Sequence, residues 1–360
     1  MSATKVGLIG CGRIAQLVHL NILTRLPDIE LVALAEPDVQ RRQEAMRRAP
    51  GAVALADYRE LLTMPDVEAV VICLPHALHA EAAVAALEQG KHVYLEKPLA
   101  TNLGEARQVL AAWQRASAIG MIGFNYRFNA LYQAVRRHIL SGRLGELVAV
   151  RSVFSSAAQA LPARQQTQQN GGGVLLALAS HHVDLVHFLF GQAVREVSAS
   201  LRSQHSEDDS AMVQLRLADG LLVQSFFSMS AVEEDRFEIY GTAGKLVVDR
   251  YRSLNVEITD PTLDLGRFKR LTQGLRSLIH SPYLLDKLHA PSREPSYQAA
   301  VAHFVAAVQA RRPISPDFSD GYRSLAVIAA AEESARTGQV ISLSGMAQEG
   351  EREKEQAVAG

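Results

Sequence analysis

A glycine-rich turn near the amino terminus has the spacing of a phosphate-binding loop. It comprises Gly10, Cys11, Gly12, Arg13 and Ile14. The first glycine permits a tight turn, the second lets the backbone approach a pyrophosphate, and the N–H groups of the helix that follows favour an anion. Glu36 ends the next apolar run, where a carboxylate can accept hydrogen bonds from the ribose hydroxyls of a dinucleotide. A carboxylate there repels a 2′-phosphate, so NAD is favoured over NADP, while Arg41 and Arg42 leave that preference open.

Two further polar groups follow other apolar runs of the chain. They are Leu74, Pro75, His76 and His79 in the first group, and Glu96 and Lys97 in the second. Ligands of open α/β sheets bind at the carboxyl ends of the strands, so both groups are expected along the cofactor. The ammonium of Lys97 could stabilise a developing alkoxide and, with a pKa lowered by burial, exchange a proton. A packing or capping role is the alternative for His79.

An apolar helix further along the chain contains two histidines and an aspartate. These are His181, His182 and Asp184, after the glycines at 171–173. A lone histidine there would more often be a core residue with its hydrogen bonds satisfied, but three polar groups in one buried helix each need a partner. A zinc site is a weak alternative, because adjacent side chains on a helix point about 100° apart.

The elements that position these residues alternate between strand and helix up to residue 125. Apolar runs predict parallel strands at 5–10, 31–35, 69–74, 91–95 and 119–124. Helical spacing falls between them, at 13–26, 38–48, 57–63, 76–89 and 103–117. This order predicts a Rossmann domain, an α/β fold with a doubly wound parallel sheet, over residues 1–125.

The pattern then changes to long alternating strands, which predict an α+β domain with a largely antiparallel, open sheet. The expected helix is 128–141, and the expected strands are 146–155, 194–204, 211–218 and 221–229, with a hairpin near 236–249. Asp219-Gly220 predicts a hairpin turn. Residues 253–295 are expected to form loops and short helix, before helices at 296–311 and 321–337. The second domain is predicted over 126–344, followed by a disordered tail over 345–360.

Composition excludes several classes of protein. The 360 residues carry 37 basic and 38 acidic side chains. The net charge of −1 does not attract the chain to nucleic acid. Cys11 and Cys73 are the only cysteines, too few for a disulfide framework, which suggests a reducing compartment. The first residues have one basic side chain and a brief apolar run, and no apolar stretch reaches the length of a membrane span. We therefore expect a cytoplasmic protein without a membrane partner.

Taken together and in order, these motifs resemble the Gfo/Idh/MocA family of glucose-fructose oxidoreductase and inositol dehydrogenase relatives. The resemblance rests on the glycine turn, Glu36-Pro37-Asp38, Glu96-Lys97-Pro98, GFNYRF at 123–128 and the histidine helix. It implies an NAD(P)-dependent enzyme that moves a hydride between the nicotinamide and a ring carbon of a sugar, sugar derivative or inositol-like polyol. It also implies that Lys97 hydrogen-bonds the reacting oxygen and that His181 is the candidate acid/base. The implied substrate pocket is lined by Asn125, Tyr126, Arg127, His182 and Asp184.

Two residues of the histidine helix depart from the pattern of the family, and one of them is Ala179, where a glycine is common. Ala177 stands where an aspartate is common, four residues before His181, on the same helix face. Asp184 is a possible substitute partner for this histidine, and Lys97 could also act alone. Two alternatives therefore stay open: an NAD-dependent glycosidase of the same fold, and a redox-inactive dinucleotide-binding regulatory protein. The open antiparallel face suggests a homo-oligomer, either a dimer or a tetramer.

Overall fold

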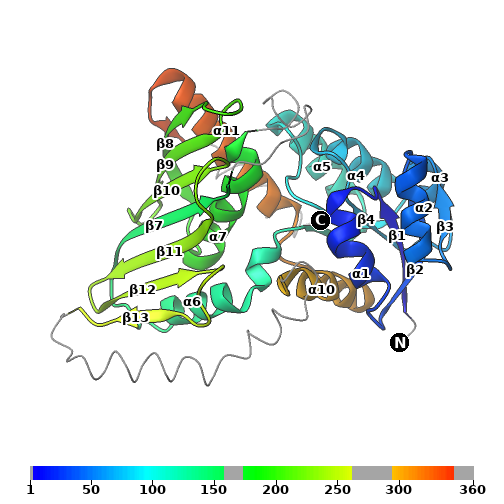
Figure 1. Cartoon of the computed structure of the whole chain (residues 1–360), viewed down its shortest axis with the longest axis horizontal. Coiled ribbons are helices and arrows are strands. Elements are labelled where there is room, and N and C mark those ends of the chain that lie inside the picture. The colour runs from blue at the N-terminus through cyan, green and yellow to red at the C-terminus, as the bar shows by residue number, and fades with distance from the viewer. Residues whose placement is uncertain (1–2, 158–172, 262–293, 344–360) are drawn as a thin grey trace. The chain divides into compact units, whose positions relative to one another are not determined.

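The computed structural model describes residues 3–157, 173–261 and 294–343 (Figure 1). They form two compact units, and the chain crosses from one to the other at three places. The first unit lies within Met1–Asn125 and Ala290–Leu325, and the second within Tyr126–His289 and Ala326–Gly360. The tail expected at 345–360, and most of the region 253–295, lie outside the described residues.

The first unit is built on a parallel sheet, as predicted, and the sheet has six strands where the sequence indicated five. Its strands are β1 (Thr4–Ile9), β2 (Ile29–Ala35), β3 (Val53–Leu55), β4 (Ala69–Ile72), β5 (His92–Leu95) and β6 (Gly120–Ile122). Their order in the sheet is β3-β2-β1-β4-β5-β6, so the direction of winding changes between β1 and β4. The central strands are apolar on both faces because helices cover both sides of such a sheet. Only β3, which is short and half-buried, lacked a signal in the sequence.

The helices between these strands begin and end close to the predicted positions. A π-helical turn at Ala15–His19 continues into α1 (Leu20–Leu23), and the others are α2 (Val39–Arg48), α3 (Tyr58–Leu62), α4 (His79–Glu88) and α5 (Leu103–Arg115). The side chain of Asp38 caps α2 by accepting a hydrogen bond from the backbone N–H of Arg41. Asn102 caps α5 in the same way.

Two carboxyl-terminal segments differ from the predicted domain boundaries. Helix α10 (Ser296–Ala310) and the start of α11 (Phe318–Thr337) belong to the first unit, although the sequence analysis assigned both to the second domain. Phe304 of α10 packs against Tyr94 of β5, with ring centroids 5.8 Å apart. Phe318 packs against Trp113 of α5 at 5.5 Å. The parallel sheet needs these helices to cover its apolar face. The sequence shows that a helix has an apolar face, but not which surface this face will cover.

The second unit contains the predicted open sheet, with eight strands. They are β7 (Leu147–Ser155), β8 (Val194–Arg202), β9 (Ser210–Leu217), β10 (Leu222–Ser228), β11 (Glu234–Gly241), β12 (Gly244–Asp249), β13 (Glu257–Thr259) and β14 (Ile341–Ser342). Their order is β13-β12-β11-β7-β10-β9-β8-β14, and all neighbours are antiparallel except β7 and β10. The predicted hairpin turn joins β9 to β10, where Gly220 has a φ of +91°.

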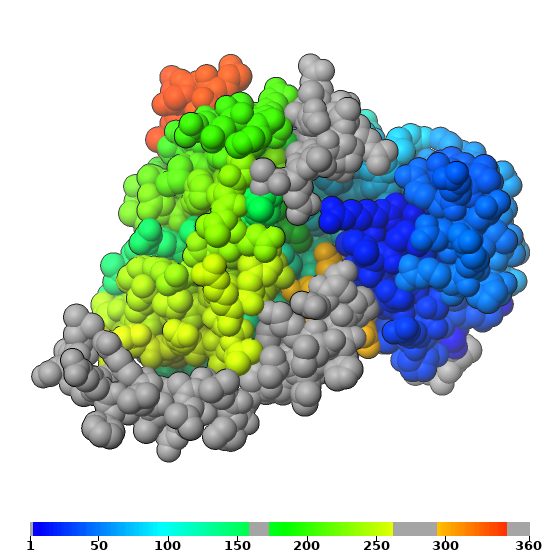
Figure 2. Space-filling model, in the orientation of Figure 1, coloured from blue at the N-terminus to red at the C-terminus, as the bar shows by residue number. Residues whose placement is uncertain are grey.

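One face of this sheet is covered by helices and the other is exposed. Helix α6 (Ala130–Leu140) and helix α7 (Ser180–Phe190), with a π-helical turn at Leu175–Ala179 before it, contribute the covering side chains. Buried and exposed residues alternate along β9 and β10. The green to yellow atoms of β8–β12 occupy much of the face of this unit that Figure 2 shows. In the described parts of the chain, no helix combines the length and the apolar character that a membrane crossing requires.

Candidate functional site

The glycine turn follows β1, and its two glycines are needed for different reasons. Gly10 has a φ of +86°, and a Cβ atom there would lie 2.8 Å from the backbone oxygen of Cys73, so the fold itself requires glycine. A Cβ atom on Gly12 would meet nothing within 4 Å. The space above Gly12 therefore suits the close approach of a ligand, which is what a pyrophosphate cradle needs.

Glu36, which follows β2, is buried and bonded directly to this turn. Its Oε2 accepts a hydrogen bond from the backbone N–H of Cys11 at 2.8 Å, and its Oε1 accepts one from Asp38 N–H at 3.1 Å. The guanidinium of Arg41 lies 3.1 Å from Oε1. Arg42 instead donates to the carbonyl oxygens of Glu36 and Pro37. The structure thus brings together the turn and the acidic residue that the sequence paired.

His79 joins the ends of β4 and β5. Its Nδ1 lies 2.6 Å from the carbonyl oxygen of Pro98, and its Nε2 lies 2.9 Å from that of Leu74. Burial lowers the pKa of His79, against the effect of these two carbonyl groups. Both ring nitrogens are therefore engaged by backbone, which supports the packing alternative for this residue. Pro75 is exposed and His76 is half-buried beside it, with the His76 ring centroid 5.5 Å from that of His79.

Glu96 and Lys97 follow β5 and differ in their surroundings. Glu96 is buried, and its Oε1 lies 2.7 Å from Nε2 of His19. Burial lowers the pKa of Lys97 to about 8, while the negative charge of Glu96 acts in the opposite direction. A lysine with this pKa can exchange a proton near neutral pH, as an acid/base group must. The sequence analysis did not single out His19; its only signal was a polar residue in the apolar segment QLVHLNI.

These residues lie at one edge of one sheet. The glycine turn, Glu36, Leu74 and Lys97 follow β1, β2, β4 and β5, which are four neighbouring strands. This edge includes the place between β1 and β4 where the winding changes, and open α/β sheets bind ligands at such a point. The open space at Gly12 and the carboxylate of Glu36 fit a dinucleotide that lies across the edge. Asn125, in the same unit, donates from its amide to Oγ of Ser296 at 2.9 Å.

In the second unit, four predicted substrate residues lie on α7 or contact it: Tyr126, Arg127, His181 and Asp184. Arg127 donates from Nε to both oxygens of Asp184, at 3.1 and 2.9 Å, and all of these groups are buried. The Asp184 carboxylate therefore holds the guanidinium of Arg127. The ring of His181 stacks on that of Tyr126, with centroids 4.2 Å apart and planes 17° apart.

His182 points to a different set of residues, as the angle between neighbouring helical side chains requires. Its Nε2 lies 3.0 Å from Oδ1 of Asp235, which also accepts a hydrogen bond from the Tyr132 hydroxyl at 2.6 Å. Arg250 donates to the other oxygen of Asp235 at 2.6 Å. Burial opposes ionisation of Asp235, yet Arg250 and His182 together hold its pKa well below the usual range. The sequence placed His182 against substrate, whereas here it belongs to a buried network on the sheet.

This network also reaches the stacked pair. The guanidinium carbon of Arg250 lies 4.4 Å from the ring centroid of Tyr126. Cation–π contact of this kind stabilises the ring position. Sequence reasoning identified neither Asp235 nor Arg250, because each contacts residues far away in the chain.

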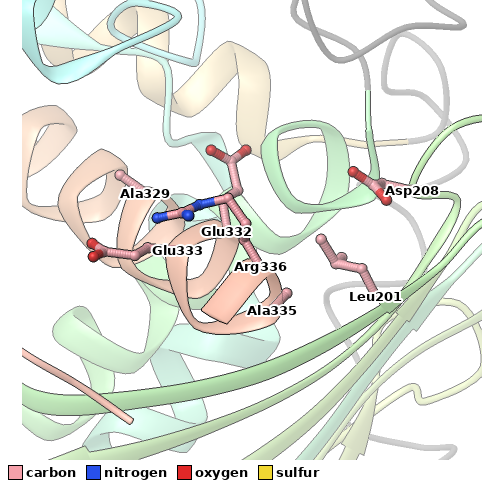
Figure 3. Close-up of a pocket in the computed structure, with 7 residues that line it drawn as sticks. All are labelled: Leu201, Asp208, Ala329, Glu332, Glu333, Ala335 and Arg336. Atoms are coloured by element: carbon pink, nitrogen blue, oxygen red, sulfur yellow. The ribbon is translucent and has the colours of Figure 1, made fainter. Parts of the chain in front are cut away.

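A cavity of about 580 Å³ lies elsewhere in the second unit, between α11 and the sheet (Figure 3). It is lined by Leu201, Asp208, Ala329, Glu332, Glu333, Ala335 and Arg336. None of these residues belongs to the predicted site. Three acidic side chains against one arginine also make this cavity unsuited to a negatively charged dinucleotide.

Two family models match this chain, one in each unit. Residues 4–124 match the model of an oxidoreductase family with an NAD-binding Rossmann fold, and residues 132–247 match that of the GFO/IDH/MocA C-terminal domain. The chain is 27% identical to myo-inositol 2-dehydrogenase of Thermotoga maritima, over 94% of this chain and 98% of that protein. It is 29% identical to 1,5-anhydro-D-fructose reductase of Ensifer adhaerens, again over 94% and 98%.

A solved structure described as an oxidoreductase domain protein, from Kribbella flavida, superposes with a TM-score of 0.81. It is 26% identical in sequence, and the match covers 95% of this chain and 100% of that one. The chain therefore belongs to the Gfo/Idh/MocA family of oxidoreductases.

Proposed function

We propose that this protein is an NAD(H)-dependent dehydrogenase or ketoreductase that acts on a ring carbon of a sugar, a sugar derivative or an inositol-like polyol. The observation that carries the proposal is the placement of the glycine turn, Glu36 and Lys97 at one edge of the parallel sheet. The names of the relatives support the substrate class, because they include an inositol dehydrogenase and a sugar reductase.

On the cofactor side, the turn from Gly10 to Ile14 holds the pyrophosphate and Glu36 accepts hydrogen bonds from the ribose. The segment Leu74–His76 borders the dinucleotide, and His79 keeps that segment in place through its bonds to backbone oxygens. When bound, the nicotinamide supplies the position that accepts or releases a hydride. NADP is the less favoured cofactor, because the Glu36 carboxylate repels a 2′-phosphate.

On the substrate side, Lys97 hydrogen-bonds the reacting oxygen and takes its proton during oxidation. A pKa of about 8 supports this role, since a large share of the side chain is neutral just above that pH. In the second unit, His181 is proposed as a second acid/base group, and Tyr126 and Arg127 are proposed as substrate contacts. Asn125 of the first unit is proposed as a further substrate contact. Asp184 then acts by fixing Arg127, and His182 by fixing the sheet side of α7.

We also propose a cytoplasmic homo-oligomer. Both cysteines are buried and unbridged, which suits a reducing compartment. The exposed sheet face carries the apolar side chains of Met212 and Leu222, and apolar side chains of this kind favour contact with a second copy. Light scattering during size-exclusion chromatography would measure the number of copies.

Turnover of a substrate panel tests the main proposal. Purified protein is mixed with NAD⁺ or NADH and with sugars, their keto derivatives and inositols, and absorbance of the reduced nicotinamide is followed. Lys97→Met is expected to keep its affinity for NADH and to lose about 10²-fold or more in kcat. Lys5→Met, a change on the exposed surface, is the matched control.

Three results would decide against the proposal in different ways. Full turnover by Lys97→Met would remove the lysine from the reaction. Release of a sugar without net formation of NADH would favour a glycosidase. Binding of NADH with no turnover on any substrate would favour a regulatory protein.

A further inference from the structure

A buried histidine and a buried glutamate lie beside Lys97 and have no part in the chemistry above. The side chain of His19 is 0% exposed and that of Glu96 is 9% exposed. Nε2 of His19 lies 2.7 Å from Oε1 of Glu96. Taking such a pair out of water is costly, and a hydrogen bond offsets only part of that cost. A pair of this kind next to a reactive lysine is therefore a candidate for a functional role.

The surroundings hold this pair in one position. The ring of His19 packs edge-on against Tyr94 at 5.7 Å and against Tyr297 at 6.1 Å. On the other side, a Cβ atom on Gly123 would lie 3.2 Å from Oε2 of Glu96 and 3.2 Å from its Cα. A side chain at residue 123 would therefore crowd the glutamate and shift it by a few tenths of an ångström.

The pair also joins two parts of the candidate cofactor site. His19 ends the helical turn Ala15–His19, which follows the glycine turn, whereas Glu96 directly precedes Lys97. We propose that His19 and Glu96 are positioning residues for Lys97: His19 holds the Glu96 carboxylate, and this carboxylate stabilises the ammonium form of the lysine. The inference rests on the proposed function for its biological meaning, but the geometry belongs to the first unit alone.

The charges around Lys97 support this assignment. Burial lowers its pKa to about 8, and Glu96 is the charged neighbour that raises it. The other titratable groups near the pair come from α4, the end of β4, β5 and α10: they are His79, Cys73, Tyr94 and Tyr297. Burial raises the pKa of both Cys73 and Tyr94 far above neutral pH, so these two groups stay uncharged. The Glu96 carboxylate is thus the charged group that raises the pKa of Lys97.

The direct test is the pKa of Lys97, measured without turnover. Lysines of the whole chain are dimethylated with ¹³C-formaldehyde, and the ¹³C signals are followed by NMR against pH. The Lys97 signal is identified by its loss in Lys97→Arg. In Glu96→Gln the pKa of Lys97 is expected to fall by about one unit, because the neighbouring negative charge that raises it is removed.

Variants of the histidine test the second half of the inference. His19→Phe keeps a ring but removes the nitrogen that holds the Glu96 carboxylate in place, so the pKa of Lys97 is expected to fall toward its value in Glu96→Gln. His19→Gln restores a donor and is expected to bring the value back toward that of the natural protein. The double variant His19→Phe/Glu96→Gln should titrate as Glu96→Gln alone does, since the two residues act as one unit. His92→Gln, at the other end of β5, is the matched control and should leave the value unchanged.

The outcomes separate this inference from the proposed function. An unchanged pKa of Lys97 in Glu96→Gln would overturn the inference, and so would additive shifts in the double variant. Glu96→Gln preserves the shape of the side chain, so it decides the question even where His19→Phe does not fold. A failure of the natural protein to bind NADH would refute the proposed function, while the lysine titration would still report on the pair.

Discussion

Substitution of Gly12 should separate binding of the cofactor from stability of the fold. Gly12 does not have a positive φ, and a Cβ atom there would meet nothing within 4 Å. Gly12→Val should therefore fold with a free energy of unfolding within about 0.5 kcal/mol of the natural protein, as surface changes usually do. The valine would occupy the space in which the pyrophosphate has to approach the backbone.

The expected loss of affinity follows from the contacts that the valine prevents. A hydrogen bond from a backbone N–H to a charged group contributes about 1.5–3 kcal/mol, and each 1.4 kcal/mol corresponds to a tenfold change in Kd. Loss of one such contact should weaken NADH binding by about 10- to 100-fold. Isothermal titration calorimetry with NADH measures this, and urea unfolding measures stability on the same samples.

Gly10→Ala is the contrasting variant in the same turn. Its φ of +86° and the distance of 2.8 Å from a Cβ atom to the Cys73 oxygen predict a loss of stability, with at least about 1–2 kcal/mol from the left-handed backbone alone. Gly12→Val with unchanged NADH affinity, or with a loss of stability like that of Gly10→Ala, would refute the reasoning about this turn.

Three further predictions concern the core of each unit and the pH dependence. Asp235→Asn should cost about 3–5 kcal/mol in urea unfolding, because it leaves the buried Arg250 without its carboxylate. The Asp235 pKa is lowered from 3.8, so the stability that its charge contributes is present above pH 3.8 and is lost as pH falls further; the deficit of the variant should shrink there. Gly120→Ala should cost about 1–3 kcal/mol, since a Cβ atom would lie 2.7 Å from the Phe318 ring. Finally, kcat/KM for alcohol oxidation should rise with pH through about 8, as Lys97 loses its proton.

The two stability predictions each have a control within the chain. Glu196→Gln breaks an exposed ion pair with Arg216 and should cost at most about 1 kcal/mol. Gly51→Ala meets nothing within 4 Å and should leave stability unchanged. If Glu196→Gln lost as much stability as Asp235→Asn, or Gly51→Ala as much as Gly120→Ala, the argument from burial would be contradicted. A pH profile that is flat between 7 and 9 would contradict the role given to Lys97.

Much of the first unit could be predicted from the sequence because its signals are local. Each parallel strand is a short apolar run, and each functional residue directly follows one of them. Gly10, Glu36 and Lys97 could thus be placed at one edge before any contact was known. The exposed face and the hairpin at Gly220 in the second unit were equally local, since alternation and turn residues determine them.

Tertiary structure alone decided which distant residues meet. The pairing of His19 with Glu96 spans 77 positions, and that of His182 with Asp235 spans 53. Helix α10 reads in the sequence only as an apolar helix, and its place on the first unit depends on Tyr94 and its neighbours. The physical reason is that periodicity records which face of an element is buried. The partner of a buried charge depends instead on how elements that are far apart in the sequence pack together.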